Sequence, residues 1–213
     1  MSIFSGACLV ISNETLRKPK VFFDQLLNRS ITVFSGVPYT YTVLTKYWGI
    51  KNLNGSMVRL LTQAGGKLDI EIKQRISDVL DNCEFWIMYG QTEFGGRISQ
   101  FRYLGHEPDA CGYPIKGTTI LIIQENEDLI SESKSVSKGK TGRIFVNSPS
   151  MCLTSKTKTL IHNGVDYMDT GDTGFIKKKM LHITGRNTAF IKVAGVRINL
   201  LDIETVFRFE NKV

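Results

Sequence analysis

The sequence predicts an α/β chain, with a mostly parallel, helix-covered part followed by a small antiparallel part resembling a β-barrel. Short apolar runs alternate with helical patterns through the first half, as in a parallel sheet covered on both faces. From about residue 105 glycines and turns become frequent, which is typical of a small antiparallel sheet or barrel. A hairpin pattern and the start of an amphipathic helix follow. We therefore expect three parts: residues 1–104, 105–184 and 185–213.

The first part is expected to hold four strands separated by three helices. The continuous apolar run at 7–11 predicts a strand buried on both faces. The other expected strands are 31–34, 58–62 and 85–88. A helix is expected to begin at Pro19, since proline is tolerated in a first turn. The other expected helices are 39–48 and, with an amphipathic pattern, 70–80.

The rest of the chain is expected to be mainly strands. Short apolar runs predict strands at 119–123, 142–146, 173–176 and 180–183. The polar, Ser- and Lys-rich stretch 125–140 indicates an exposed loop. A strand at 189–193 is expected to pair with 196–198, and an amphipathic helix to begin at Leu200 and reach Phe209.

Composition indicates a cytoplasmic protein with no transmembrane segment. Of the 213 residues 42% are apolar, yet no apolar run approaches the roughly 20 residues that span a bilayer. The first residues lack the basic stretch of a signal peptide. The cysteines are widely spaced without a CxxC motif, so we interpret them as buried free thiols in a reducing compartment; they are Cys8, Cys83, Cys111 and Cys152.

The net charge of +7 makes an acidic partner plausible. The basic residues are spread along the chain, and the densest cluster, Lys177–Lys179, is too short for a nucleic-acid-binding arm. We therefore expect no nucleic-acid partner. A basic nucleic-acid binder remains an alternative that only the charge favours.

The first segment whose residue types could bind a ligand is 89–93, YGQTE, directly after an expected strand. Ligands of parallel sheets bind beyond the carboxyl ends of strands, and Gly90 would let the backbone approach one closely. Tyr89 can stack on a planar base, Thr92 can donate to a phosphate oxygen and Glu93 can hold Mg²⁺, which usually takes one or two carboxylates. The alternative is an ordinary turn with a solvated glutamate.

Two later segments combine glycine with charged residues. In 167–174, YMDTGDTG, the Asp172 carboxylate is suited to accept the two vicinal hydroxyls of a ribose. An ordinary hairpin turn is the alternative. In 185–198 glycines and basic residues are interleaved with apolar ones. That pattern suits a linker entering a hairpin beside an anion, or an exposed edge hairpin with solubilising charges.

Together and in this order, the three segments resemble the adenylate-forming (AMP-binding) superfamily. That group contains acyl-CoA synthetases, adenylation domains of nonribosomal peptide synthetases and luciferases. Three further stretches agree: 31–38 (ITVFSGVP) resembles its strand–turn–helix and 63–68 (QAGGKL) its Gly-rich loop. The third, 139–144 (GKTGRI), resembles its Gly-Glu-Leu strand entry, with Arg143 replacing the usual acid.

The resemblance implies that the protein activates a carboxylic acid with ATP. The products would be an acyl-adenylate, which carries AMP, and pyrophosphate. The acyl group would then pass to the thiol of coenzyme A or of a carrier-protein phosphopantetheine. Tyr89 would pack against adenine, with Gly90 in the same binding turn. Thr92 would contact the α-phosphate and Glu93 would bind Mg²⁺, and these two are the candidate catalytic residues.

The remaining implied contacts lie in other segments. Asp172 would take the ribose hydroxyls with help from Arg186, while Gly65 and Gly66 would border the adenine and the acyl pocket. Lys192 would belong to the beginning of a mobile C-terminal lid, so that residues 185–213 would be the start of that lid.

Three departures from the family pattern qualify this expectation. No Ser/Thr/Gly-rich phosphate loop ending in Pro-Lys-Gly precedes the first expected strand, the late lysine of the lid is absent, and Thr188 stands where the hinge usually holds Asp or Lys. We therefore expect a fragment of a larger enzyme with weak nucleotide binding and little or no adenylation alone. A complementing chain would supply the phosphate loop and lid. The alternative is a non-catalytic nucleotide-binding remnant.

Overall fold

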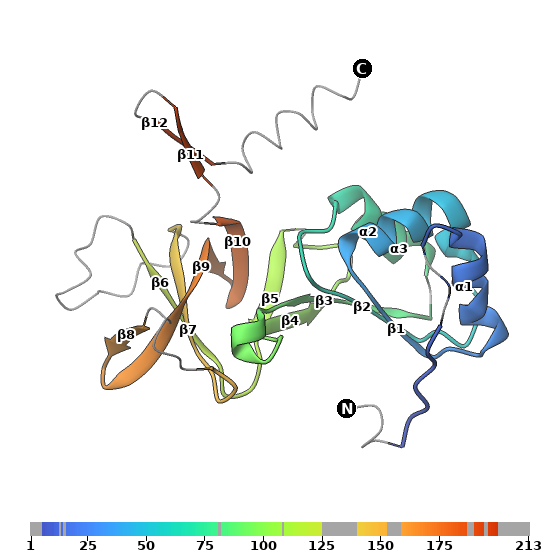
Figure 1. The fold of residues 1–213 in the computed structure, drawn as a ribbon, viewed down its shortest axis with the longest axis horizontal. Coiled ribbons are helices and arrows are strands. Elements are labelled where there is room, and N and C mark those ends of the chain that lie inside the picture. The colour runs from blue at the N-terminus through green and yellow to red at the C-terminus, as the bar shows by residue number, and fades with distance from the viewer. Residues whose placement is uncertain are drawn as a thin grey trace. The chain divides into compact units, whose positions relative to one another are not determined.

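The computed structural model describes residues 6–12, 14, 16–80, 82–107, 109–124, 140–152 and 159–186, together with the backbone of 190–193 and 196–199. The chain is a mixed α/β protein (Figure 1). It divides into two compact units, the first formed by Met1–Trp86 and Arg102–Pro108. The second unit is formed by Ile87–Phe101 and Asp109–Val213. The expected division into three parts stays a prediction.

The three helices that the sequence predicts within residues 1–104 are confirmed, and all three belong to the first unit. α1 spans Pro19–Asn28, α2 spans Pro38–Val43 and α3 spans Ile70–Val79. Proline stands in the first turn of both α1 and α2, where its missing N–H has no intrahelical partner to lose. After α2 the chain continues as a π-helical turn, Leu44–Trp48, and then as a 3₁₀ turn, Ile50–Leu53.

The strands of the first unit bring two carboxyl ends to one edge. β1 (Val33–Gly36) and β2 (Leu60–Gln63) pair in parallel, with Gly36 opposite Gln63. β3 (Glu84–Tyr89) begins in this unit and ends in the second. Aromatic side chains dominate the core around these strands, and Tyr41 packs edge-on against Phe85, with ring centroids 5.3 Å apart.

Two expectations about apolar residues are wrong. Residues 7–11 form no strand in the structure, and Leu9 and Ile11 are 61% and 78% exposed. A strand buried on both faces needs neighbouring strands and a covering layer, and an apolar run alone supplies neither. The cysteines are free, as expected, but not buried: Cys8 and Cys152 are exposed, and the other two are half-buried.

The second unit is an antiparallel sheet with the order β4-β5-β10-β9-β7-β6, and β8 also pairs with β9. Its core contains Phe94, Ile98, Ile144 and Leu181, and Tyr89 packs against that core. Three of its strands, at 99–102, 110–114 and 159–162, were not predicted from the sequence, because they are short and lack a clear alternation of apolar and polar residues. The strands are β4 (Ser99–Arg102), β5 (Ala110–Pro114), β6 (Thr119–Ile123), β7 (Gly142–Asn147), β8 (Thr159–His162), β9 (Val165–Lys177) and β10 (Met180–Arg186).

The long strand β9 contains the segment that the sequence places before a strand. β7 pairs along one side of β9, while β8 pairs with its start and β10 with its end. Between Arg143 and Phe145 the β7–β9 register shifts, and Gly171 adopts φ +72°. Residues 170–172 therefore form a bulge inside β9, so the placement of this segment before the strand and its alternative interpretation as a hairpin turn are both wrong, while the ribose role of Asp172 stays a prediction. Bulges of this kind re-aim side chains.

The last described elements confirm the expected hairpin. β11 (Phe190–Val193) pairs antiparallel with β12 (Val196–Asn199). The helix expected from Leu200 and, apart from Lys140, the loop expected at 125–140 lie outside the described residues. In the described parts of the chain no helix combines the length and the apolar character needed to cross a bilayer.

Candidate functional site

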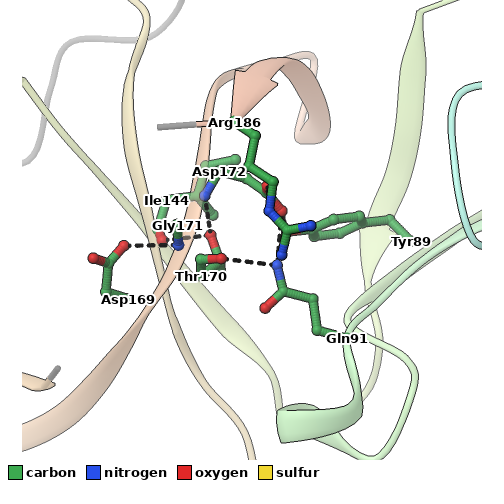
Figure 2. Close-up of polar contacts among 8 residues, drawn as sticks. All are labelled: Tyr89, Gln91, Ile144, Asp169, Thr170, Gly171, Asp172 and Arg186. Carbon is green, nitrogen blue, oxygen red and sulfur yellow. Dashed lines mark hydrogen bonds and ion pairs between the residues drawn. The ribbon is translucent and has the colours of Figure 1, made fainter. Parts of the chain in front are cut away.

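The carboxylate of Asp172 is the centre of a hydrogen-bonded cluster in the second unit (Figure 2). Its side chain is only 10% exposed. The Tyr89 hydroxyl donates to Asp172 Oδ2 at 2.6 Å, and Gln91 Nε2 donates to the same oxygen at 2.7 Å. The turn after β3 and the bulge of β9, more than 80 residues apart in sequence, thus meet at one carboxylate oxygen.

Arg186 approaches the other oxygen of this carboxylate from β10. It stands opposite Asp172 in the β9–β10 register, and its Nε lies 3.3 Å from Asp172 Oδ1. The Arg186 side chain is 58% exposed, so solvent screens this ion pair and weakens it. Oδ1 therefore faces the half-exposed Arg186, whereas Oδ2 faces Tyr89 and Gln91.

Four hydrogen bonds hold the bulge that presents Asp172. The Thr170 hydroxyl donates to the carbonyl of Ile144 on β7 at 2.9 Å and accepts from the Asp172 N–H at 3.1 Å. Gln91 Nε2 donates to the Thr170 carbonyl at 2.9 Å, and the Gly171 N–H donates to Asp169 Oδ1 at 2.9 Å. These bonds satisfy backbone groups that the interrupted ladder leaves without partners.

An ion pair behind the bulge anchors Asp169. Arg143 on β7 bonds to Asp169 Oδ2, and the two side chains are 18% and 7% exposed. The guanidinium also lies 5.4 Å from the ring centroid of Phe145. Arg143, which departs from the family pattern in the sequence, thus has a charge partner one residue before the bulge.

The ionisation of the cluster follows from its burial. Burial raises the pKa of Asp172 above its ordinary value, and the hydrogen bond from Tyr89, the charge of Arg186 and the hydrogen bond from Gln91 oppose that rise. Burial also raises the pKa of the Tyr89 hydroxyl, and the neighbouring Asp172 charge adds to this effect. Tyr89 therefore stays a neutral hydrogen-bond donor across the physiological pH range.

The turn after β3 is tight, and Gly90 makes it possible. A Cβ atom at Gly90 would lie 2.3 Å from the carbonyl oxygen of Gly96, so no larger residue fits without a shift of the backbone. Thr92 and Glu93 stand on the short 3₁₀ turn Thr92–Phe94 and are exposed. The turn therefore presents a hydroxyl and a carboxylate to solvent, in the same compact unit as Asp172.

Three other residues that the sequence predicts for the site are not part of this cluster. Gly65 and Gly66 are exposed in the first unit, after β2, where Gln63 Nε2 donates to the Gly66 carbonyl at 2.8 Å. Lys192 lies on β11 opposite Arg197, and its side chain lies outside the described residues.

The residues near Glu93 fit Mg²⁺ only if the ligand supplies further oxygens to the ion. Within the described residues no three His, Cys, Asp or Glu side chains gather into a cluster that could hold a metal. An exposed carboxylate suits Mg²⁺, which keeps several waters and binds through one or two carboxylates plus substrate phosphates. Glu93 would hold the ion together with a ligand's phosphate oxygens.

Sequence reasoning did not assign a role to Gln91, Thr170 or Asp169. Gln91 lies inside the YGQTE segment, so its place between Tyr89 and Thr92 was a signal for a site residue. Thr170 and Asp169 directly precede Gly171, but their function depends on contacts with β7, which local sequence does not reveal.

The chain matches the AMP-binding enzyme family over residues 1–154. Among curated proteins it is 25% identical over 218 residues to gramicidin S synthase 2 of Brevibacillus brevis, covering 99% of this chain and 5% of that protein. It is 29% identical over 191 residues to the probable CoA ligase CCL8 of Humulus lupulus, covering 83% of this chain and 30% of that protein. The chain thus spans less than half the length of these relatives.

Solved structures show the same fold. The O-succinylbenzoate coenzyme A synthetase of Bacillus subtilis, in complex with ATP and magnesium, superimposes with a TM-score of 0.75 at 17% identity, covering 100% of this chain and 43% of that one. ATP-bound MatB of Rhodopseudomonas palustris gives a TM-score of 0.75 at 22% identity, covering 96% and 40%. With the family match spanning most of its length, the chain belongs to the AMP-binding enzyme family.

Proposed function

We propose that the second unit binds the ribose and phosphates of an adenine nucleotide, with Asp172 as the ribose acceptor. The observation that carries this proposal is the Asp172 carboxylate itself, which is nearly buried yet has one oxygen that faces the half-exposed side chain of Arg186. A buried carboxylate is costly unless a ligand or the protein supplies hydrogen bonds to it. The position of Tyr89 and of the turn containing Thr92 and Glu93 supports the same assignment.

The reaction we propose for the protein is that of an acid–thiol ligase. A carboxylate oxygen of the acid substrate would attack the α-phosphorus of ATP. The bond from the α-phosphorus to the oxygen bridging to the β-phosphorus would break, so that pyrophosphate leaves and an acyl-adenylate forms. A thiolate of coenzyme A or of a carrier-protein phosphopantetheine would then attack the acyl carbon and release AMP.

The residues of this chain would serve the first step by binding and charge stabilisation. Thr92 would donate a hydrogen bond to an α-phosphate oxygen, where negative charge develops. Glu93 would help to hold Mg²⁺, whose chemistry is to neutralise phosphate charge. Asp172 and Arg186 would fix the ribose, which positions the α-phosphorus over the Thr92–Phe94 turn.

Titration calorimetry with AMP tests the ribose assignment. Asp172→Asn removes the charged acceptor and should weaken AMP binding at least tenfold, because a hydrogen bond to a charged group contributes about 1.5–3 kcal/mol. The matched control is Asp166→Asn, which changes an exposed carboxylate on the same strand and should leave the affinity unchanged. Equal AMP affinity in the wild-type chain and Asp172→Asn would contradict the proposal.

Titration with ATP, with and without Mg²⁺, tests Glu93. In Glu93→Gln we expect Mg²⁺ to strengthen ATP binding less than in the wild-type chain, while AMP binding in the absence of metal stays the same. An unchanged effect of Mg²⁺ would remove Glu93 from the proposed metal site without affecting the assignment of Asp172.

A further inference from the structure

We propose that Gln91 is a positioning residue that holds Asp172 Oδ2 against donors of the protein and leaves Oδ1 facing Arg186, and that this arrangement makes the site distinguish the two ribose hydroxyls. This inference rests on the proposed nucleotide site and adds a specificity determinant to it. In Figure 2 the Gln91 amide nitrogen points toward Asp172 and Thr170.

The orientation of the Gln91 amide is fixed by its two acceptors. Its Nε2 lies 2.7 Å from Asp172 Oδ2 and 2.9 Å from the Thr170 carbonyl oxygen. An ionised carboxylate and a carbonyl can only accept, so both hydrogens of the amide nitrogen are used and the amide oxygen cannot occupy that position. The same nitrogen lies 3.5 Å from the Tyr89 hydroxyl, which is too far for a strong third bond.

The two oxygens of the carboxylate are consequently unequal. Oδ2 accepts from both Tyr89 and Gln91, which uses the two lone pairs of a carboxylate oxygen. Among the described residues, Oδ1 has one polar contact, of 3.3 Å, with the half-exposed Arg186. A ligand hydroxyl would therefore gain a strong bond at Oδ1, whereas a second hydroxyl would compete with donors already in place at Oδ2.

Gln91 also ties this orientation to the backbone. By bonding Thr170 as well as Asp172, it links the carboxylate to the bulge that carries it. Without Gln91, Tyr89 would be the one donor to Oδ2 that remains among these contacts, and Oδ2 would have a lone pair free for a ligand. The two oxygens would then become similar acceptors, and the preference between hydroxyls would fall.

The experiment measures binding of AMP, 2′-deoxy-AMP and 3′-deoxy-AMP to the full chain by calorimetry. For the wild-type chain we expect one deoxy nucleotide to bind at least tenfold more weakly than AMP and the other to lose less than about threefold. Gln91→Met keeps the side-chain length but removes the donors. In this variant we expect the losses of affinity, relative to AMP, of 2′-deoxy-AMP and 3′-deoxy-AMP to agree within about threefold. Gln100→Met makes the same change on β4 and should retain the wild-type pattern.

A second variant and a folding control keep the result interpretable. Gln91→Asn retains the amide but shortens its reach, so it should also bring the two losses together. Circular dichroism and thermal unfolding of each variant establish that it is folded before its ligand ratios are compared.

The outcomes separate this inference from the proposed function. If the wild-type chain discriminates between the deoxy nucleotides and folded Gln91→Met keeps the same ratio, the positioning role of Gln91 is wrong while the nucleotide site stands. If the wild-type chain binds AMP but treats both deoxy nucleotides alike, the inference is again wrong. If it binds none of the three, both the proposed site and the inference are overturned.

Discussion

The Tyr89 hydroxyl donates a 2.6 Å hydrogen bond to Asp172 Oδ2 and so joins the turn after β3 to the bulge of β9. The tyrosine packs its ring against the core of the second unit, and its raised pKa keeps the hydroxyl protonated. Tyr89 is thus a permanent donor to a carboxylate that burial would otherwise destabilise. The contact turns two separate segments of sequence into one site.

Tyr89→Phe tests this contact directly. Because the hydrogen bond lowers the pKa of Asp172, its loss should raise that pKa further, and AMP affinity should fall about five- to tenfold as the carboxylate loses a fixed donor. The pKa is measured by ¹³C NMR of labelled aspartate, and the affinity by calorimetry. Tyr113→Phe, at a half-exposed tyrosine on β5, should change neither; an unaltered Asp172 pKa in Tyr89→Phe would contradict the assigned bond.

Asp172→Asn should change the free energy of unfolding by an amount that depends on pH. Since burial holds the folded pKa of Asp172 above its unfolded value, the folded state binds the proton more tightly. The stability that this group contributes is therefore full below the unfolded pKa of about 3.9 and is lost as the pH rises through the folded pKa. The asparagine does not ionise, so its unfolding free energy should rise relative to that of the wild-type chain between pH 4 and pH 7.

Urea denaturation of both chains at several pH values measures this difference. Asp166→Asn, at an exposed position of β9, is the matched control and should show a smaller pH-dependent difference. A wild-type chain that gains stability over Asp172→Asn as the pH rises would show that the hydrogen bonds outweigh burial. If Asp172→Asn is more stable than the wild-type chain near neutral pH and also binds AMP more weakly, Asp172 lowers the stability of the fold and contributes to ligand binding.

Local sequence was sufficient to predict elements whose formation depends on local chemistry. α3 follows from an amphipathic pattern and from Asp69, whose side chain caps the helix by accepting from the Glu71 N–H at 3.2 Å. β6 coincides with its apolar run. The run at 7–11 was as apolar as β6, yet it forms no strand, because strand formation depends on a neighbour that the run itself does not specify.

The bulge of β9 could not be predicted for a related reason. Gly171, preceded by Thr170, has the composition of a turn, and the sequence carries no local mark of the β7 contacts that keep the segment within a strand. Asp172 was nevertheless a candidate from the sequence, because a short carboxylate beside glycines suits a ribose; the structure brings it to the Tyr89 hydroxyl, and its ribose role stays a prediction. Gln91 was overlooked because an amide has no single chemical role until its acceptors are known.

The Arg143–Asp169 pair should be important for stability. Arg143→Met would leave the Asp169 carboxylate buried without a charge partner, which costs about 3–5 kcal/mol. The double variant Arg143→Met/Asp169→Asn should cost less than the sum of the two single changes, since it leaves no unpaired charge. Urea denaturation measures the cycle.

An exposed ion pair provides the comparison for that cycle. Arg102 and Glu84 lie 3.1 Å apart with side chains 50% and 45% exposed, so Arg102→Met should cost at most about 1 kcal/mol. If Arg143→Met destabilises the chain no more than Arg102→Met does, the pair behind the bulge has no special role in holding Asp169.

Gly90→Ala tests whether the close approach within the YGQTE turn is required. The new Cβ would lie 2.3 Å from the Gly96 carbonyl oxygen and 2.7 Å from Arg97 Cα, so the backbone must move, at a cost of about 2–3 kcal/mol. Gly96→Ala separates this steric effect from conformational strain, because Gly96 has φ +84° but no atom within 4 Å of an added Cβ. The cost of Gly96→Ala should be about 1 kcal/mol.

Chemical denaturation compares the free energies of unfolding of Gly90→Ala and Gly96→Ala. AMP titration should show weaker binding for Gly90→Ala, because the displaced turn carries Tyr89 and Gln91. Equal destabilisation by the two variants, with AMP binding intact, would mean that the turn accommodates the added Cβ without strain.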